Sequence, residues 1–412
     1  MGFVVRCRGK TNPGKLRSAD ADLLGAAMPE GLPRSRVLGQ ARTLPSGFRL
    51  MEEKIISFRS TDRPTEGGPD DEMAARPMDT VALPRHVQIE PVGQCNLRCR
   101  MCPIEFRSES RPGHPPAFID VDVYERLVDQ FGVIDELHLQ GLGEPLMHPR
   151  FFDLVAYAAK RGIRVSTNTN MTLMTDARAA RCVSSGLHAL HVSIDAAHAE
   201  VYEAIRQQAS FVKVMRNLRR IMSARRIAAS ALPHVHLVVV VMRANLLELP
   251  DLVRLASAEG VESLSVQHLC HDFGEAGLPE QYKPMRAFIE DQTLLCEDPV
   301  RVAAVFDETR REAARLAVEL RLPNLTPRRH APDVPGRERC DWPWRSAYVA
   351  YDGRAMPCCM VATPDRASFG NMARSGVAAV WNNAGYSAFR AALSSARPPE
   401  ICRSCAVYRG TF

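Results

Sequence analysis

The sequence has no apolar run long enough to cross a membrane, since the stretch LVVVVM at residues 237–242 has only the length of a buried strand. It also has no secretory signal pattern at its start. Hydrophobic residues make up 46% of the 412 residues, and the mean hydropathy is −0.17. These features are typical of a globular protein in water, and they predict a cytoplasmic protein with no membrane partner.

An excess of positive charge is also missing from most of the chain, although the formal net charge is +6. Residues 1–50 contain nine Lys or Arg and three Asp or Glu, which leaves 44 residues of each sign after residue 50. Proteins that bind nucleic acid usually carry a basic surface. The composition therefore predicts no nucleic-acid partner.

Residues 1–80 lack a sustained hydrophobic period, and residues 60–80 (STDRPTEGGPDDEMAARPMDT) are rich in Pro, Gly and charged residues. Such a composition cannot bury enough apolar surface to fold, so we predict a disordered N-terminal extension over residues 1–80. It can be a targeting segment or a basic tail. Alternatively, translation starts at Met51.

After residue 85, short apolar runs alternate with amphipathic helical patterns. The expected strands are 86–92, 135–140, 164–168, 189–194, 235–242 and 262–269. The expected helices lie near 121–133, 149–162, 175–186, 198–226 (broken near 209–210) and 247–259. This alternation, with connections of this length, predicts parallel strands joined by right-handed crossovers.

Three cysteines follow the first expected strand, in the run HVQIEPVGQCNLRCRMCPIEF: Cys95, Cys99 and Cys102. With C-x3-C-x2-C spacing, their thiolates can bind three irons of a [4Fe–4S] cluster and leave the fourth iron open for a substrate or cofactor. Zinc is an alternative, but it needs a fourth ligand, for which the nearest candidate is His114. A disulfide framework fits poorly with 12 scattered cysteines and no signal peptide.

The three-cysteine spacing resembles the signature of the radical S-adenosylmethionine (radical SAM) family. In that family the open iron binds the amino and carboxylate groups of SAM, and reductive cleavage of SAM yields a 5′-deoxyadenosyl radical. The resemblance implies an α/β fold, a partial (β/α)6 TIM-like barrel over residues 81–275, with the chemistry at the carboxyl ends of the strands. It also implies an electron donor such as flavodoxin or ferredoxin.

The element GLGEP follows the second expected strand and is similar to the family's GGE-type element, from which it departs at Leu142. Gly141 and Gly143 allow the backbone to approach a ligand closely. Glu144 can accept a hydrogen bond from the amino group of SAM. We therefore expect all three residues to bind the cofactor, although an ordinary turn is the alternative.

Further cofactor-binding candidates follow the third and fourth expected strands. Asn168 lies in STNTN, and Ser193 and Asp195 in HVSID can bond a ribose or a carboxylate. Arg206 in YEAIRQ matches an arginine that often pairs with the SAM carboxylate in the family. The alternatives are that Asp195 caps the next helix and that Arg206 lies on a solvated helix face.

The C-terminal segment contains a second set of cysteines, Cys340, Cys358 and the pair Cys402-x2-Cys405, and this arrangement resembles the SPASM/Twitch extension of radical SAM enzymes. The resemblance implies a small α+β iron–sulfur domain over residues 336–412 with one auxiliary [4Fe–4S] cluster, closer to the Twitch form. By spacing its ligands are Cys340, Cys358, Cys402 and Cys405. Gly353 predicts a hairpin turn before Cys358, FGNM predicts a short strand, and VWNNAGYSAFRAAL predicts a helix. A four-cysteine zinc site is the alternative, and Cys359 can replace Cys358.

Two clusters imply an oxidoreductase that takes a hydrogen atom from an unactivated C–H bond and passes the second electron to the auxiliary cluster. We expect a small-molecule substrate, because nothing resembles the winged helix that binds peptides in many relatives. A helical linker over residues 276–335 lines or covers the pocket. Cys270, beside His268, can instead return a hydrogen atom and make the enzyme an epimerase. The sequence is also compatible with a peptide-modifying enzyme and, more distantly, with a non-catalytic metal-binding scaffold.

Overall fold

The computed structural model describes residues 80–107, 117–269, 273–325 and 340–409, all of which belong to one compact unit of the chain. The predicted N-terminal extension, His114 and Cys270 lie outside the described residues, so the expectations for them stay predictions. In the described part of the chain, no helix combines the length and the apolar composition needed to span a membrane.

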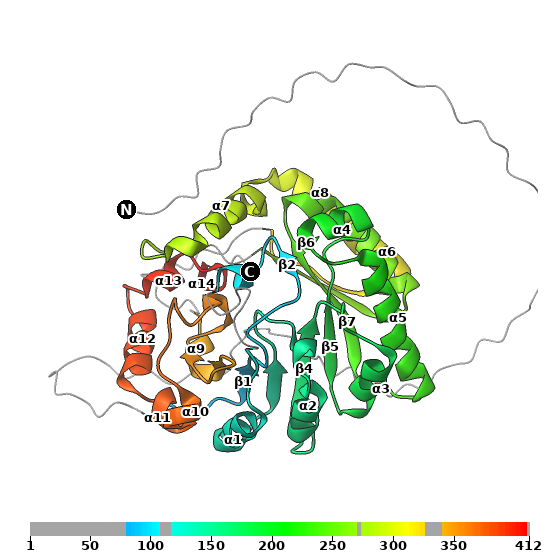
Figure 1. Ribbon diagram of the computed structural model, residues 1–412. Coiled ribbons are helices and arrows are strands. Elements are labelled where there is room, and N and C mark those ends of the chain that lie inside the picture. Colours follow the sequence, from blue (N-terminus) through cyan, green and yellow to red (C-terminus); the bar gives the residue numbers. More distant parts are fainter. Residues whose placement is uncertain (1–79, 108–116, 270–272, 326–339, 410–412) are drawn as a thin grey trace, which may run out of the picture. The chain divides into compact units, whose positions relative to one another are not determined.

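Six parallel strands, adjacent in chain order, form the centre of the molecule, with helices in the connections between them (Figure 1). The strands are β1 (His86–Ile89), β3 (Glu136–Leu139), β4 (Arg164–Thr169), β5 (Ala189–Ser193), β7 (His234–Val241) and β8 (Ser263–His268). The helices are α1 (Val121–Phe131), α2 (Phe151–Ala159), α3 (Asp176–Ser184), α4 (Ala199–Ile205), α5 (Phe211–Ile227) and α6 (Leu249–Ala258). The α/β fold class is confirmed, and each expected strand lies within three residues of an observed one.

A two-residue burial period explains why these segments form strands. In β7, Val235, Leu237, Val239 and Val241 are buried in the main hydrophobic core, while the alternate residues are only partly buried. Side chains of successive residues point to opposite faces of a sheet. One face of the sheet therefore packs against the helices, and the other face is more polar.

Polar caps fix where several helices begin. The side chain of Asp120 accepts a hydrogen bond from the amide of Val123 at the start of α1, and Ser210 accepts one from Lys213 at the start of α5. The helix expected over residues 198–226 is interrupted as predicted, because α4 ends at Ile205 and α5 begins after Ser210. That break contains β6 (Arg206–Gln207), which pairs antiparallel with β2 (Arg98–Cys99).

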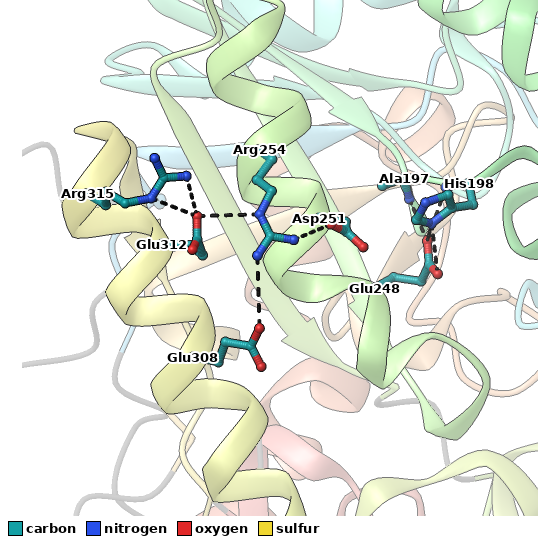
Figure 2. A network of polar contacts seen from close by, with 8 residues as sticks. All are labelled: Ala197, His198, Glu248, Asp251, Arg254, Glu308, Glu312 and Arg315. Atoms are coloured by element: carbon teal, nitrogen blue, oxygen red, sulfur yellow. Dashed lines mark hydrogen bonds and ion pairs between the residues drawn. The ribbon is translucent and has the colours of Figure 1, made fainter. Parts of the chain in front are cut away.

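The segment that was predicted to be a helical linker is helical, but it also extends the sheet. It contains η5 (Glu280–Tyr282), α7 (Lys283–Gln292), η6 (Leu294–Cys296), α8 (Pro299–Leu316) and β9 (Glu319–Arg321). Strand β9 pairs in parallel with β8. Figure 2 shows how α8 lies against α6: Arg254 of α6 contacts Glu308 and Glu312 of α8.

The C-terminal region joins the other edge of the same sheet. Strand β10 (Ser346–Val349) pairs in parallel with β1, and β11 (Ala355–Met356) pairs with β10 as a hairpin. Gly353 lies in the turn with a φ of 85°, a conformation that glycine adopts without strain, so the predicted hairpin is confirmed. The remaining elements are α9 (Trp342–Arg345), η7 (Cys359–Val361), α10 (Met372–Ser375), α11 (Val377–Trp381), α12 (Ala384–Ser394), α13 (Glu400–Arg403) and α14 (Ala406–Arg409).

The short strand predicted from FGNM is wrong, because Asn371 forms only an isolated bridge with Arg354. The side chain of Asn371 instead caps α10 by accepting a hydrogen bond from the amide of Arg374. The predicted helix in VWNNAGYSAFRAAL corresponds to α11 and α12, separated by Asn382 and Asn383. Because β10 is bonded to β1, the two predicted domains share one sheet, and their exact boundaries stay a prediction.

Candidate active site

The three cysteines of the C-x3-C-x2-C motif lie on the loop that leaves the carboxyl end of β1. Strand β2 contains Cys99, and its pairing with β6 places Cys99 opposite Arg206. Burial raises the pKa of all three thiols, that of Cys95 to about 12. Cys99 further raises the pKa of Cys95 and of Cys102, and Cys95 raises that of Cys102. The three sulfur atoms are thus close together in a desolvated place, where thiolates need cationic partners.

The described residues contain no group of three or more His, Cys, Asp or Glu side chains already arranged to hold a metal ion. The fit of an iron–sulfur cluster to this loop therefore depends on the proximity of the thiols and on the donors around them. The side-chain amide of Asn170 lies 3.8 Å from the sulfur of Cys95, and Nη1 of Arg206 lies 4.0 Å from the sulfur of Cys99. Such donors favour thiolate ligands and tune a cluster.

Glu144 lies at the carboxyl end of β3 and is 2% exposed. Its Oε1 accepts hydrogen bonds from the hydroxyl of Thr169 (2.6 Å) and the amide of Leu146 (3.1 Å), and its Oε2 accepts one from the amide of Asn170 (2.7 Å). Burial nevertheless raises the pKa of Glu144, and Glu144 in turn raises the pKa of Cys95. A carboxylate has about four acceptor positions, so one remains for a ligand.

The two glycines of GLGEP are required by the protein's own packing. A Cβ atom on Gly143 would lie 2.0 Å from the carbonyl oxygen of Val92, and one on Gly141 would lie 2.2 Å from Oε1 of Glu90. The structure thus explains these two glycines by contacts within the protein, and the expectation that they make room for a ligand stays a prediction. They let the loop after β3 pack directly on the loop after β1.

Asp195 and Arg206 form a buried ion pair. Nε of Arg206 donates to Oδ2 of Asp195 over 2.7 Å, and Oδ1 of Asp195 accepts from the amide of Val240 over 2.9 Å. The helix-cap alternative for Asp195 is wrong, since His198 is the N-cap residue of α4. The solvated alternative for Arg206 is also wrong, since Arg206 is only 7% exposed.

Asn168 and Ser193 lie on the more polar face of β4 and β5. Both residues are partly buried, and their contact with a ligand stays a prediction. Sequence analysis missed Asn170, which contacts Glu144 directly, as Thr169 also does. The signal was present in STNTN, but the burial pattern of β4 was needed to show which of its polar residues meet Glu144.

The second cysteine set converges on the hairpin β10–β11. Cys340 precedes α9, Cys358 follows β11, Cys402 lies in α13, and Cys405 follows it. Burial raises the pKa of the Cys358 thiol, and the thiols of Cys340, Cys359, Cys402 and Cys405 raise it further. These four sulfur atoms therefore lie within electrostatic range of Cys358. Cys359 remains an alternative to Cys358.

His268, which is near Cys270 in the sequence, is the last residue of β8 and is buried. One of its ring nitrogens lies 3.1 Å from the carbonyl oxygen of Asn324, and burial lowers its pKa. The ring is thus engaged with the chain that follows β9, and it favours the neutral form at physiological pH.

Family models match both parts of this site. A model of the radical SAM superfamily matches residues 89–256, and a model of the SPASM iron–sulfur cluster-binding domain matches residues 340–406. The first match contains the three-cysteine loop, Glu144 and the Asp195–Arg206 pair. The second contains the auxiliary cysteines. The chain belongs to the radical SAM superfamily and carries a C-terminal SPASM domain.

Individual relatives cover most of the chain at low identity. A tungsten-containing aldehyde ferredoxin oxidoreductase cofactor-modifying protein of Pyrococcus furiosus is 23% identical over 78% of this chain and 87% of its own. The PqqA peptide cyclase of Granulibacter bethesdensis is 25% identical over 80% and 81%. The AdoMet-dependent heme synthase of Methanosarcina barkeri is 34% identical, but over only 30% of this chain and 34% of its own.

Solved structures show the same fold. Streptococcus suis SuiB bound to precursor peptide SuiA has a TM-score of 0.56 and 14% identity, covering 81% of this chain and 72% of its own. The family and the fold together establish the cofactors as a [4Fe–4S] cluster with SAM and further iron–sulfur binding in the SPASM domain.

Proposed function

We propose that this radical SAM protein takes a hydrogen atom from an unactivated carbon of a peptide substrate and modifies that peptide. The observation that carries the radical SAM chemistry is the placement of two buried groups of opposite charge, Glu144 and Arg206, beside the three thiols. The amino acid end of SAM carries an ammonium and a carboxylate. A carboxylate acceptor and a guanidinium donor match those two groups.

The chain's own residues have distinct roles in this proposal. Cys95, Cys99 and Cys102 bind the SAM cluster, and Glu144 accepts from the SAM amino group through its remaining acceptor position. Arg206 uses Nε for Asp195 and Nη1 for Cys99, and no described residue occupies its Nη2, which can donate to the SAM carboxylate. Gly141 and Gly143 hold the Glu144 loop in place, while Asn168, Ser193 and Asp195 are candidates for the nucleoside part.

When bound, the cluster and SAM supply the 5′-deoxyadenosyl radical that takes the hydrogen atom. Cys340, Cys358, Cys402 and Cys405 are the proposed ligands of the auxiliary cluster. With all four sites taken, an auxiliary cluster exchanges electrons and does not bind substrate. Net two-electron oxidation of the substrate carbon would follow if the substrate radical lost a proton and gave its second electron to an auxiliary cluster held by these cysteines.

A peptide substrate is better supported than the small molecule expected from the sequence. The match to PqqA peptide cyclase spans four-fifths of both chains. The fold that SuiB uses with its precursor peptide is also the fold of this chain. The second candidate is oxidation of a small molecule or cofactor, favoured by the similarity to the Pyrococcus cofactor-modifying protein.

Anaerobic reconstitution tests the chemistry. We expect about eight irons per chain for two cubic clusters, and reductive release of 5′-deoxyadenosine from SAM that is lost in the triple variant C95A/C99A/C102A. Zinc in place of iron, or intact SAM after reduction, would contradict the radical SAM chemistry. A short peptide encoded beside the gene is the first substrate to add. A mass change in that peptide supports peptide modification, and turnover of only a small molecule supports the second candidate.

A further inference from the structure

The loop that follows Cys358 and Cys359 accepts hydrogen bonds from two buried guanidinium groups on consecutive carbonyl oxygens. Nη1 of Arg366 donates to the carbonyl oxygen of Val361 over 3.0 Å, and Nη2 of Arg107 donates to that of Ala362 over 2.9 Å. Ala362 has a φ of 68°, which is unfavourable for a residue with a Cβ atom. The loop is thus held in a specific shape directly after the auxiliary cysteines.

Arg107 belongs to the SAM-cluster side of this contact, because it follows η1 (Pro103–Phe106), which begins directly after Cys102. Its Nη1 lies 3.0 Å from each carboxylate oxygen of Glu90, and the two side chains are 1% and 0% exposed. Oε1 of Glu90 also accepts from the amide of Leu142 in the GLGEP loop over 3.0 Å. This one ion pair therefore touches the SAM-cluster loop, the Glu144 loop and the auxiliary loop.

A second ion pair holds the same loop from the β8 side. Nε and Nη2 of Arg366 donate to the two carboxylate oxygens of Glu275 over 2.6 and 2.8 Å. The guanidinium lies 4.3 Å from the centre of the Phe273 ring, which stacks on Tyr282. The hydroxyl of Tyr282 in turn donates to the hydroxyl of Thr363 over 3.1 Å.

Stability alone does not explain why two ion pairs are buried here. Burying two charges is expensive, and well-packed apolar residues often serve stability equally well. The Glu275–Arg366 pair is bidentate, with two nitrogens on two oxygens, and this geometry fixes both distance and orientation. In the Glu90–Arg107 pair, Nη1 alone contacts both carboxylate oxygens, while Nη2 is directed at the loop. The guanidinium of each pair also donates to a carbonyl oxygen of the loop after Cys359, at Val361 or Ala362. Both pairs therefore restrain this loop.

We propose that Glu90–Arg107 and Glu275–Arg366 are positioning pairs that hold the auxiliary-cluster loop at a fixed place against the SAM-cluster loop. This proposal rests on the proposed function for its purpose, which is electron exchange between the substrate site and the auxiliary cluster. Arg107 also brings a permanent positive charge to the loop that follows Cys358 and Cys359, through its bond to the carbonyl of Ala362. A nearby positive charge stabilises the reduced, more negative form of a cluster.

Hydrogen–deuterium exchange of the reconstituted protein tests the positioning role. We expect amides in residues 355–369 to exchange at least threefold faster in R107M, E90Q and E275Q than in the wild type. The matched control is R85M, which breaks the exposed pair between Arg85 and Asp135 and is expected to leave this segment unchanged. Wild-type exchange in all three variants would overturn the proposal. If R107M does not fold, E275Q, which removes a charge with little change of shape, still decides the outcome.

A redox titration followed by electron paramagnetic resonance tests whether Arg107 acts on the auxiliary cluster or whether its loss only makes the loop more mobile. The potential of the auxiliary cluster is expected to fall in R107M, which loses a positive charge, and to rise in E90Q, which loses a negative one. R107K keeps the charge, so its potential returns toward the wild-type value while the loop still exchanges faster. Equal potentials in the wild type, R107M and E90Q would contradict the placement of Arg107 beside the cluster.

The yield of modified peptide per 5′-deoxyadenosine distinguishes this proposal from the proposed function. We expect the yield to drop at least threefold in R107M and E90Q while SAM cleavage continues. A wild-type protein that cleaves no SAM would end the proposed function, but the exchange comparison would remain valid. A normal yield in variants with a loosened loop would show that the fixed position has no role in turnover.

Discussion

The Asp195–Arg206 pair allows the sharpest test of how the SAM site is built. Asp195 is fully buried, and besides Arg206 its carboxylate accepts a hydrogen bond from the amide of Val240. In R206M the carboxylate keeps its burial and loses its counter-charge. Breaking a buried ion pair by removing one partner typically costs about 3–5 kcal/mol, and we expect R206M to lose that much free energy of unfolding.

The double variant D195N/R206M removes both charges and leaves a neutral amide that can still accept from Val240. We therefore expect its loss to be smaller than the sum of the two single losses by about 1–3 kcal/mol, the range for groups in direct contact. The control is R181M, which breaks an exposed pair with Asp153 and should cost less than about 1 kcal/mol.

Urea denaturation followed by far-ultraviolet circular dichroism, under anaerobic reducing conditions, measures the stability of the wild type and of each variant. Binding of SAM to the folded, reconstituted variants adds a second measure, because R206M should lose affinity even where it is fully folded. A loss below about 1 kcal/mol in R206M, or a double variant as unstable as the sum of the singles, would refute the argument that the pair is buried and coupled.

Three further perturbations follow from the same structure. Burial, with His138 and His236 nearby, lowers the pKa of His191 to about 3, so below about pH 6.5 the folded state binds fewer protons than the unfolded state. The free energy of unfolding should therefore decrease as the pH is lowered, by about 2 kcal/mol for this residue at pH 5. The urea midpoint of H191F should decrease less than that of the wild type over the same pH range. G143A places a Cβ atom against the carbonyl of Val92 and should cost about 1–3 kcal/mol with weaker SAM binding, seen by calorimetry. R254A removes the contacts of Arg254 with Asp251, Glu308 and Glu312 that Figure 2 shows, and it should shift the thermal midpoint little, and less still in high salt.

The core strands were predictable because their burial follows a simple period. Val235, Leu237 and Val239 alternate with partly buried residues in β7, and such alternation is visible in the sequence. Strand β9 and the pairing of the hairpin strand β10 with β1 were not predicted. The two strands have three and four residues, and only their pairing with β8 and β1 makes them strands. Short edge strands depend on tertiary hydrogen bonds that a local pattern does not contain.

The site was predictable where a motif and a strand end coincide, as for Cys95, Cys99, Cys102 and Glu144. The reasons for other residues were not predictable. Gly143 is small because the carbonyl of Val92 approaches it, and that contact joins two loops that are distant in the sequence. No local signal distinguishes such a glycine from one that makes room for a ligand.

The strand-end loops around this site share a construction from buried ion pairs. Three buried guanidinium–carboxylate pairs, Asp195–Arg206, Glu90–Arg107 and Glu275–Arg366, each join segments that are not adjacent in sequence. An apolar mouth would pack as tightly, but it would desolvate the ammonium and carboxylate of SAM without compensation. Pairs that are already ordered can offer unused acceptor and donor positions at fixed places without reorganising when the ligand arrives. In the proposed function, the Asp195–Arg206 pair therefore has two uses: it holds its loops, and it presents a donor to SAM that cannot relax away.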